Sequence, residues 1–314
     1  MTGTYILRKG HAKLSDLVDG NTGFGYRTDS VWYVDSVNGS DDYDGRTWES
    51  AYATIDKGID QARYLPGTTT LDTTKDANKL VLVAPGHYNE GELLFSGYNI
   101  TIEGCGPGVP GKDYGVSINY DGAANATAAL AFSGSGITLR NLHIYCDFAA
   151  PAVYCAGGDN NLIENCVIEC DGSTCTYGIQ MASMKGSWIR NCIIHGAVTA
   201  GIWVEGGADH YFIHGGIRGC QVYSATSNTT GILVDVTNVA YNSVIDRNFV
   251  TLTTGSSAKG IDVNTTAGGP LVVDNYVSVA TSATPIEHAG GDVFLMGNHT
   301  SAGTVNVDPN PAAG

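Results

Sequence analysis

The sequence predicts an all-β solenoid, a parallel β-helix in which every coil adds one strand to each face. Three observations lead to this prediction. A short phrase of two aliphatic residues, a polar residue and a turn residue occurs seven times between Ile137 and Asn298, at steps of 23 to 29 residues. A second phrase, of the type Gly-Ile-x-Val, stands between the first ones. No helical period separates them, and repeats of roughly 20 to 50 residues are typical of solenoids.

The composition favours a β-rich chain with many tight turns. Of the 314 residues, 42 are glycine and only 15% are charged, and the net charge is −15. This negative charge argues against a nucleic-acid partner and against an anionic membrane surface. No apolar run of roughly 18 residues occurs, so we expect no membrane insertion. The first residues lack the apolar core of a secretory signal peptide, and no motif indicates a cofactor.

The N-terminal part is predicted to hold an arm and a capping helix. Residues 1–30 have no clean hydrophobic period, and we interpret them as an arm that anchors the protein to a partner. Residues 54–64 place Ile59 and Ala62 on one helical face after Thr54, a suitable N-cap. Because a β-helix exposes unpaired strand edges at its end, we expect this helix to cover them.

The β-helix itself is expected to span residues 31–308, and residues 309–314 form a short tail. Near its start, Asp41, Asp42 and Asp44 lie together in a loop. Their spacing differs from that of the twelve-residue calcium loop. We therefore interpret them as a solvated turn and expect no metal site.

Asparagine is the turn residue in six of the seven phrases. Asparagine tolerates the left-handed backbone of a tight bend, and stacked amides can hydrogen-bond from coil to coil. We therefore expect one structural column of turn asparagines. It consists of Asn141, Asn165, Asn191, Asn248, Asn275 and Asn298.

Three of the eight cysteines directly follow a turn residue. Cys166, Cys192 and Cys220 should face inward and act as small buried hydrophobes. Cys170 and Cys175 flank one turn, so a disulfide between them stays open. Free thiols in the core favour folding in a reducing cytosol.

The outward residues of the second phrase form a column that combines aromatic and acidic side chains. It consists of Tyr154, Gln180, Trp203, Leu233, Asp262 and Glu287. Two residues further along each strand, Glu205 and Asp235 stand on consecutive coils. Glycosidases use two carboxyl groups, so Glu205, Asp235 and Asp262 are candidate catalytic residues, and Trp203 and Tyr154 could stack on sugar rings. The alternatives are a solvated acidic stripe or a subunit contact built on Trp203 and Leu233. His195, His210 and His214 have no Ser or Cys partner at a readable spacing, so we expect no nucleophilic triad.

Several local motifs resemble those of one known family. The matching segments are Tyr33-Val-Asp35, Gly39-Ser-Asp41, Asp44-Gly45, Ala53-Thr-Ile55, Pro85-Gly-x-Tyr88 and Ile100-Thr-Ile-Glu-Gly104. With the asparagine coils they make residues 31–300 similar to the pectate-lyase-like right-handed parallel β-helix family. The first of them are similar to those of bacteriophage tailspikes and other virion β-helix proteins. Pectate-lyase activity would need calcium-binding acids and a basic proton acceptor, and neither outward column contains Lys or Arg.

The resemblance implies a function in a virus particle. We expect a bacteriophage-type virion surface protein, either a capsid decoration or a component of a tail spike or fibre, that forms a homotrimer. It would be made in the host cytoplasm, and its arm would contact other capsid or tail proteins. The alternative is a polysaccharide depolymerase that uses Glu205, Asp235 and Asp262, or an adhesin that binds a host surface glycan without cleaving it.

Overall fold

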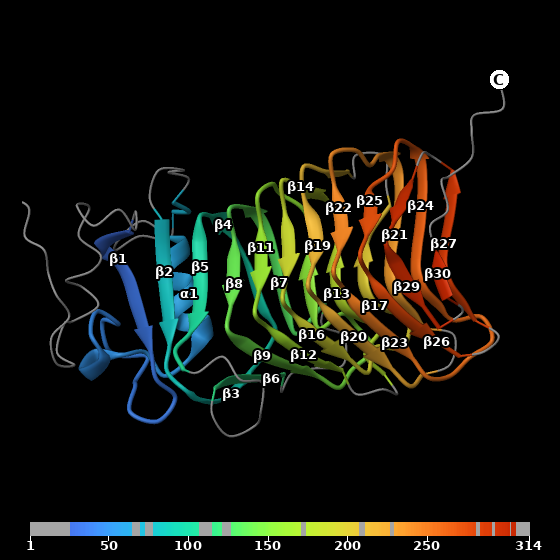
Figure 1. Cartoon of the computed structure of the whole chain (residues 1–314). Coiled ribbons are helices and arrows are strands. Elements are labelled where there is room, and N and C mark those ends of the chain that lie inside the picture. Colours follow the sequence, from blue (N-terminus) through green and yellow to red (C-terminus); the bar gives the residue numbers. More distant parts are fainter. Residues whose placement is uncertain are drawn as a thin grey trace, which may run out of the picture.

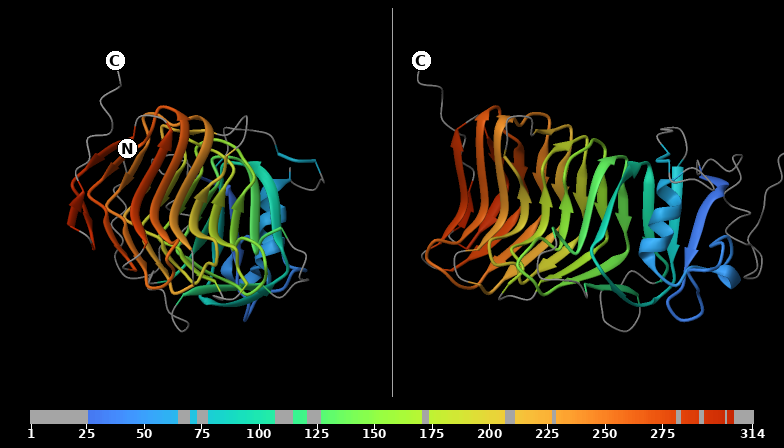
Figure 2. Two further views of the ribbon diagram at one scale, coloured as in Figure 1. Left: turned by 90° about the vertical axis from the view of Figure 1, so that its right-hand side faces the viewer. Right: turned by 180° about the vertical axis from the view of Figure 1, so that it is seen from behind.

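The computed structural model describes residues 26–305, except for 65–69, 73–77, 107–114, 121–126, 171–173, 207–210, 227–228, 281–282, 291–292 and 302. Within these residues the chain winds through three parallel sheets, which run side by side along one elongated body (Figure 1). The view along the body shows the coils stacked behind one another (Figure 2). The predicted all-β parallel solenoid is therefore confirmed.

Each coil passes through the first, second and third sheet in turn. The first sheet contains, in spatial order, β1 (Tyr26–Val34), β2 (Asn78–Val83), β5 (Ile100–Gly104), β8 (Thr138–Arg140), β11 (Leu162–Glu164), β15 (Trp188–Arg190), β19 (Gly216–Arg218), β22 (Val244–Asp246), β25 (Leu271–Val273) and β28 (Phe294–Met296). The second contains β3 (Gly86–Glu90), β6 (Val116–Tyr120), β9 (Leu142–Cys146), β12 (Val167–Cys170), β16 (Ile193–His195), β20 (Gln221–Ser224), β23 (Phe249–Leu252), β26 (Tyr276–Val279), β29 (Asn298–Thr300) and β30 (Gly303–Val305). The third contains β4 (Leu93–Tyr98), β7 (Leu130–Ser135), β10 (Val153–Cys155), β13 (Tyr177–Met181), β17 (Ala200–Val204), β21 (Thr230–Val239), β24 (Lys259–Ala267) and β27 (Thr284–Gly290).

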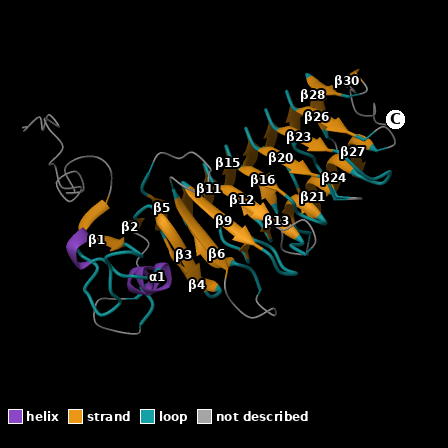
Figure 3. Ribbon diagram, turned by 90° about the horizontal axis from the view of Figure 1, so that it is seen from below, coloured by secondary structure: helices purple, strands orange, loops and turns teal. Residues whose placement is uncertain are grey.

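Two smaller features complete the described strands. The short strands β14 (Met184–Lys185) and β18 (Phe212–Ile213) pair in parallel beside the main body. At the C-terminal end, β30 folds back on β29 in an antiparallel pair. Figure 3 shows the strands of the second sheet following one another from β3 to β26.

The N-terminal end carries a helix where the third sheet has no strand. Helix α1 (Ile55–Arg63) follows the short 3-10 helix η2 (Trp48–Ser50), and the Thr54 side chain accepts a hydrogen bond from the Lys57 amide at 3.3 Å. The helix buries Ile59 and Ala62 and contacts β4, the edge strand of the third sheet. The predicted helix at 54–64 is confirmed to within one residue at each end.

The first strand begins earlier than expected. β1 starts at Tyr26 and pairs with β2, so the β-helix includes the last residues of the predicted arm. The remainder of that arm, residues 1–25, lies outside the described residues, as does the tail at 309–314. The role of the arm stays a prediction.

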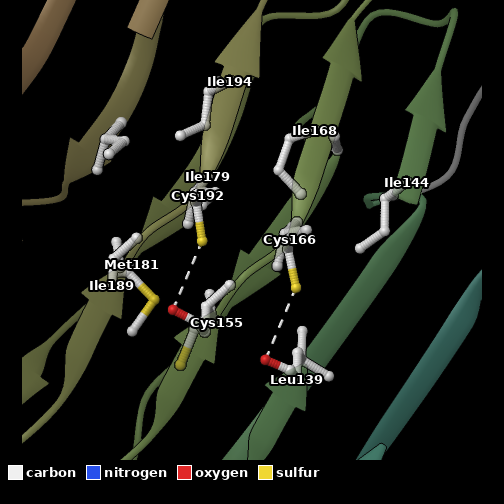
Figure 4. Packing of buried hydrophobic residues seen from close by; sticks show 14 of the residues in the cluster. Leu139, Ile144, Cys155, Cys166, Ile168, Ile179, Met181, Ile189, Cys192 and Ile194 are labelled. Carbon is white, nitrogen blue, oxygen red and sulfur yellow. Dashed lines mark hydrogen bonds between the residues drawn. The ribbon is translucent and has the colours of Figure 1, made fainter. Parts of the chain in front are cut away.

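The core is a stack of aliphatic and sulfur-containing side chains along the body. Ile144, Ile168, Ile194 and Val222 are in direct register on the second sheet and are buried. Figure 4 shows the three isoleucines aligned from coil to coil, with the Sγ of Cys166 and Cys192 directed at carbonyl groups of the first sheet. Cys166, Cys192 and Cys220 are buried as predicted. All eight cysteines are free thiols, so Cys170 and Cys175 are not bridged.

The predicted asparagine column is in fact two neighbouring columns, and the prediction was wrong on this point. Asn141, Asn165 and Asn191 occupy the corner itself, with φ of 57°, 53° and 51°. In the later coils the corner is held by Gly219, Arg247, Asp274 and Gly297. Asn248, Asn275 and Asn298 come one residue after this corner and are buried.

These three later asparagines are buried and form the amide ladder. Asn248 Nδ2 donates to Asn275 Oδ1 at 3.0 Å, and Asn275 Nδ2 donates to Asn298 Oδ1 at 2.9 Å. In the earlier coils the same inward position holds Cys166, Cys192 and Cys220. The asparagine ladder thus continues the cysteine column, and it satisfies buried amides that would otherwise destabilise the fold.

Candidate functional site

The outer face of the third sheet carries the predicted column in the predicted register. Tyr154 pairs with Gln180, and Gln180 with Trp203. Trp203 pairs with Leu233, and the column continues through Asp262 and Glu287. Glu205 and Asp235 directly follow the paired residues Val204 and Val234, which places them on adjacent coils. The alternation of strand side chains is sufficient to predict all of these positions.

An aromatic patch occupies the middle of this face. It consists of Tyr154, Tyr177 and Trp203. The rings of Tyr177 and Trp203 lie 4.5 Å apart between centroids at 33°. All three residues are partly exposed, and the Trp203 Nε1 is covered without a hydrogen-bond partner. Burial raises the pKa of Tyr154 and of Tyr177, and the charge of the neighbouring Glu205 raises both further.

Fixed hydrogen bonds hold the polar groups on either side of the patch. Gln180 Nε2 donates to Glu205 Oε2 at 2.9 Å. Further along the body, Lys259 Nζ contacts Asp262 Oδ2 at 2.8 Å and Glu287 Oε2 at 3.3 Å. The hydrogen bond to Asp262 raises the pKa of Lys259. The site therefore has a carboxylate held by an amide at one end and two carboxylates joined by an ammonium group at the other.

Sequence reasoning missed Lys259 and Tyr177. Both stand directly before the glycine of a Gly-Ile-x-Val phrase, in a third column that joins Tyr177, Ala200, Thr230 and Lys259. The face therefore does contain a cation, although neither predicted column contributes one. The sequence did contain a signal for these two residues. A long side chain directly before the glycine of the phrase can reach the outward column of its own strand, and Tyr177 and Lys259 both have such a side chain.

The predicted catalytic carboxylates differ in their surroundings. Asp235 is exposed, whereas Asp262 is 4% exposed and its carboxylate is paired with Lys259. Glu205 is partly buried and hydrogen-bonded to Gln180. Glu205 and Asp235 are brought to neighbouring coils, but Asp262 pairs in register with Leu233 and is engaged by its own strand.

A hollow of about 410 Å³ lies on the outer face of the second sheet, near its N-terminal end. It is lined by His87, Ser117, Asn119, Tyr120, His143 and Tyr145, from β3, β6 and β9. Ser117 Oγ lies 3.2 Å from His143 Nδ1, and His143 Nε2 lies 3.0 Å from Glu169 Oε2. Sequence reasoning missed this chain of contacts.

The signal for these contacts was present in the numbering. Ser117, His143 and Glu169 are separated by 26 residues each, which is close to the length of one coil. Sequence analysis considered His195, His210 and His214 and not His143. Of these three, His195 and His214 have no Ser or Cys hydrogen-bond partner in the described structure, and His210 lies outside it.

The acidic loop near the start of the body forms internal hydrogen bonds. Asp41 Oδ1 accepts from the amides of Ala53 and Thr54, at 2.9 and 3.0 Å, and so holds the start of α1. Asp44 Oδ1 accepts from Ser50 Oγ at 2.6 Å. Within the described part of the chain, no group of three or more His, Cys, Asp or Glu side chains is placed to hold a metal ion. None of the described helices is long and apolar enough to cross a membrane.

Comparison with known proteins agrees with this architecture. The family described as "Right handed beta helix region" matches residues 88–217. No curated protein matches the sequence. The fold is therefore a right-handed parallel β-helix of the pectate-lyase-like type.

Solved structures of low sequence identity share this fold. Pectin methylesterase PemA from Erwinia chrysanthemi is 14% identical with a TM-score of 0.58, over 88% of this chain and 91% of that one. Pectate lyase Pel9A is 12% identical with a TM-score of 0.53, over 92% of this chain and 83% of that one. Pectin methylesterase from Aspergillus niger is 15% identical with a TM-score of 0.52, over 90% and 88%. At this identity the similarity shows the fold alone.

Proposed function

We propose that the protein binds a polysaccharide along the outer face of the third sheet. The aromatic patch is the observation that carries this proposal. Trp203 is packed against Tyr177 and yet partly exposed, so its ring is a rigid apolar surface held in place before a ligand arrives. The C–H face of a sugar ring can stack on such a surface, and little conformational entropy is lost because the ring is already fixed.

The polar groups beside the patch supply the second part of the site. Sugar hydroxyl groups need donors and acceptors in fixed positions, and a few placed polar groups normally set the specificity of a ligand site. Gln180 lies on the coil before Trp203 and is bonded to Glu205, which follows the strand of Trp203. The pair of Lys259 and Asp262 lies two coils further on. Because neighbouring coils are about 4.8 Å apart, a chain of sugars laid along the body would meet each of these groups in turn.

The charge of the protein limits the kind of polysaccharide. The net charge is −15, and the cation on this face, Lys259, is already engaged by two carboxylates. An acidic polysaccharide would be repelled. We therefore expect a neutral glycan rather than a polyuronate such as pectate.

The same geometry favours binding over cleavage on this face. A glycosidase needs two carboxyl groups that are free to flank the bond to be cleaved. Asp262 is 4% exposed and is held by Lys259, and Glu205 is held by Gln180. Of the three candidates, Asp235 is the exposed one.

The similar structures named above are of a lyase and esterases of pectic polysaccharides, which supports a glycan as the ligand. Assembly into a virus particle, trimer formation and attachment through residues 1–30 stay predictions. A host surface glycan would satisfy both the binding proposal and the expected virion role. The glycan site does not depend on that role.

A glycan array followed by affinity electrophoresis tests the proposal. Trp203→Ala should weaken binding of a neutral polysaccharide by about tenfold or more, which corresponds to ~1.4 kcal/mol. Trp188→Ala is the matched control, because Trp188 lies on the first sheet against Arg190. The control should bind within about twofold of wild type, since each 0.4 kcal/mol changes affinity about twofold. Absence of any neutral glycan ligand, or equal loss in both variants, would contradict the proposal.

A further inference from the structure

We propose that the hollow on the second sheet is an ester-hydrolysing site, with Ser117 as nucleophile, His143 as general base and Glu169 as positioning residue. This site lies on a different sheet from the glycan-binding face. The proposal rests on a chain of three contacting side chains, of which Ser117 and His143 line the hollow and Glu169 contacts His143 from beside it. It does not depend on glycan binding.

The order of the contacts matches the roles that acyl transfer needs. Ser117 and His143 are paired in register on β6 and β9, and their Oγ and Nδ1 atoms lie 3.2 Å apart. Glu169 reaches diagonally from β12, and its Oε2 lies 3.0 Å from His143 Nε2. A nucleophile, a base within hydrogen-bond reach and a third group that orients the base form the arrangement by which such sites are recognised.

Glu169 fixes the proton on the correct ring nitrogen. A carboxylate only accepts hydrogen bonds, so Nε2 must carry a proton and donate it to Oε2. In the neutral imidazole this leaves the lone pair on Nδ1, facing Ser117. His143 can therefore take the Ser117 proton. In the chymotrypsin-type triad the serine faces Nε2 and the carboxylate faces Nδ1. Here the two nitrogens are interchanged, and the imidazole ring has the same role as general base.

Ser117 also contacts Asn119, and this contact would be expected if Ser117 had only a structural role. Its Oγ donates to Asn119 Oδ1 at 3.3 Å, and Asn119 Nδ2 donates to Asn89 Oδ1 at 3.3 Å. For the reaction, the hydroxyl group rotates so that its proton faces His143 Nδ1 instead of Asn119. A polar ladder on the sheet surface would need only these bonds. The ladder does not account for the contact between His143 and Glu169, which is 3.0 Å long and crosses the register.

Each step of the reaction balances. Ser117 Oγ bonds to the carbonyl carbon while its proton moves to His143 Nδ1. The bond from that carbon to the alcohol oxygen then breaks, and the alcohol leaves with the proton from Nδ1. Water attacks the acyl ester of Ser117 and gives a proton to Nδ1, and Oγ takes this proton as its bond to the carbon breaks. One ester and one water yield one carboxylic acid and one alcohol.

The hollow itself limits the substrate. Its volume of about 410 Å³ is at the small end of ligand sites. The lining is polar or aromatic, with no aliphatic side chain among the described lining residues, so a long acyl chain would find no apolar wall. His87, which pairs with Ser117 from the preceding coil, can donate a hydrogen bond to the developing oxyanion. We therefore expect a short, acetyl-sized ester of a polyhydroxylated alcohol.

Covalent labelling of the full chain with a fluorophosphonate, read by intact mass and peptide mapping, tests the nucleophile. One adduct per chain is expected at Ser117, and Ser117→Ala should remove it. His143→Gln should slow labelling by about 100-fold or more, as expected for loss of a general base. Ser278→Ala and His299→Gln, on the same outer face and remote from Glu169, are matched controls and should label like wild type. Absence of an adduct at Ser117, or labelling that is unaffected by His143→Gln, would overturn the proposal.

Hydrolysis of 4-nitrophenyl acetate and octanoate tests the substrate class and the role of Glu169. Wild type should prefer the acetate, and Ser117→Ala should reduce the rate to that of the buffer. Glu169→Gln should lower kcat with little change in KM, because Glu169 orients His143 and is not among the residues that line the substrate hollow. A rate that Ser117→Ala leaves unchanged, or a preference for octanoate, would contradict the proposed site.

Discussion

Glu90 links the second sheet to the N-terminal helix through a single buried carboxyl group. Its side chain is buried beneath α1, and Oε1 accepts a hydrogen bond from the Ile55 amide at 2.7 Å. Burial raises the pKa of Glu90 to about 7, and the nearby charge of Asp56 adds to this effect. The helix therefore begins on a group that titrates near neutral pH.

The raised pKa predicts how stability depends on pH. Folding binds a proton at Glu90 between the unfolded pKa of about 4.3 and the folded value of about 7. The contribution of Glu90 to stability is therefore fully present below the unfolded pKa and is lost as pH rises through the folded pKa. Glu90→Gln keeps the acceptor and removes the titration. In urea unfolding at pH 5 and pH 8, wild type should lose on the order of 2 to 3 kcal/mol relative to this variant. Parallel stability in wild type and variant at both pH values would contradict the assignment.

Residue-level prediction from sequence succeeded where a side chain's direction follows from alternation along a strand. Trp203 and Glu205 face outward and Ile194 faces inward for this reason. It failed where long side chains reach across columns. Lys259 contacts Asp262 on its own strand, and Glu169 reaches His143 across the register. Neither contact follows from strand periodicity, because periodicity gives the face on which a side chain lies and not how far the side chain reaches along that face.

At the scale of the strand, the glycine of the Gly-Ile-x-Val phrase has a packing role. A Cβ at Gly201 would collide with Val222 Cγ1 of the second sheet, and Gly231 and Gly260 meet valines in the same way. The phrase glycine therefore lets the third sheet approach the β-branched residues of the second.

This packing gives a direct test of the coil geometry. Gly201→Ala should lower the free energy of unfolding by about 1 to 3 kcal/mol, the usual cost of overpacking a core. Gly91→Ala is the matched control, because a Cβ at Gly91 meets no atom within 4 Å. The control should stay within about 0.5 kcal/mol of wild type. Chemical denaturation measures both, and equal stabilities for the two variants would show that the third and second sheets are not in the described register.

At the scale of the whole molecule, the fold was predictable and the site only partly so. The repeated phrases carry the period, and the solenoid follows from it. The split of the asparagine column was not predicted, because asparagine suits both the left-handed corner and the buried ladder position one residue after it. The contact between Ser117 and His143 was missed because β6 precedes the first repeated phrase, so its register against β9 did not follow from the repeats.

The solenoid spreads different chemistry over different faces of one body. The third sheet presents the aromatic patch, and the second sheet presents the hollow. The core between them consists mainly of aliphatic side chains, together with aromatic rings and free cysteines. Changes on one face should therefore leave the other face intact, since sites that share no partners usually behave independently.

The central claim is that the third sheet holds a neutral polysaccharide without cutting it. Size-exclusion chromatography with light scattering measures both parts at once, through co-elution of protein with polysaccharide and through the molar mass of the polymer over time. The account predicts co-elution that Trp203→Ala weakens by about tenfold or more, with no fall in polymer molar mass. Glu205→Gln combined with Asp235→Asn should leave the molar mass equally constant. A fall in molar mass with wild type that disappears in this double variant would contradict the account, and would assign these carboxylates to catalysis.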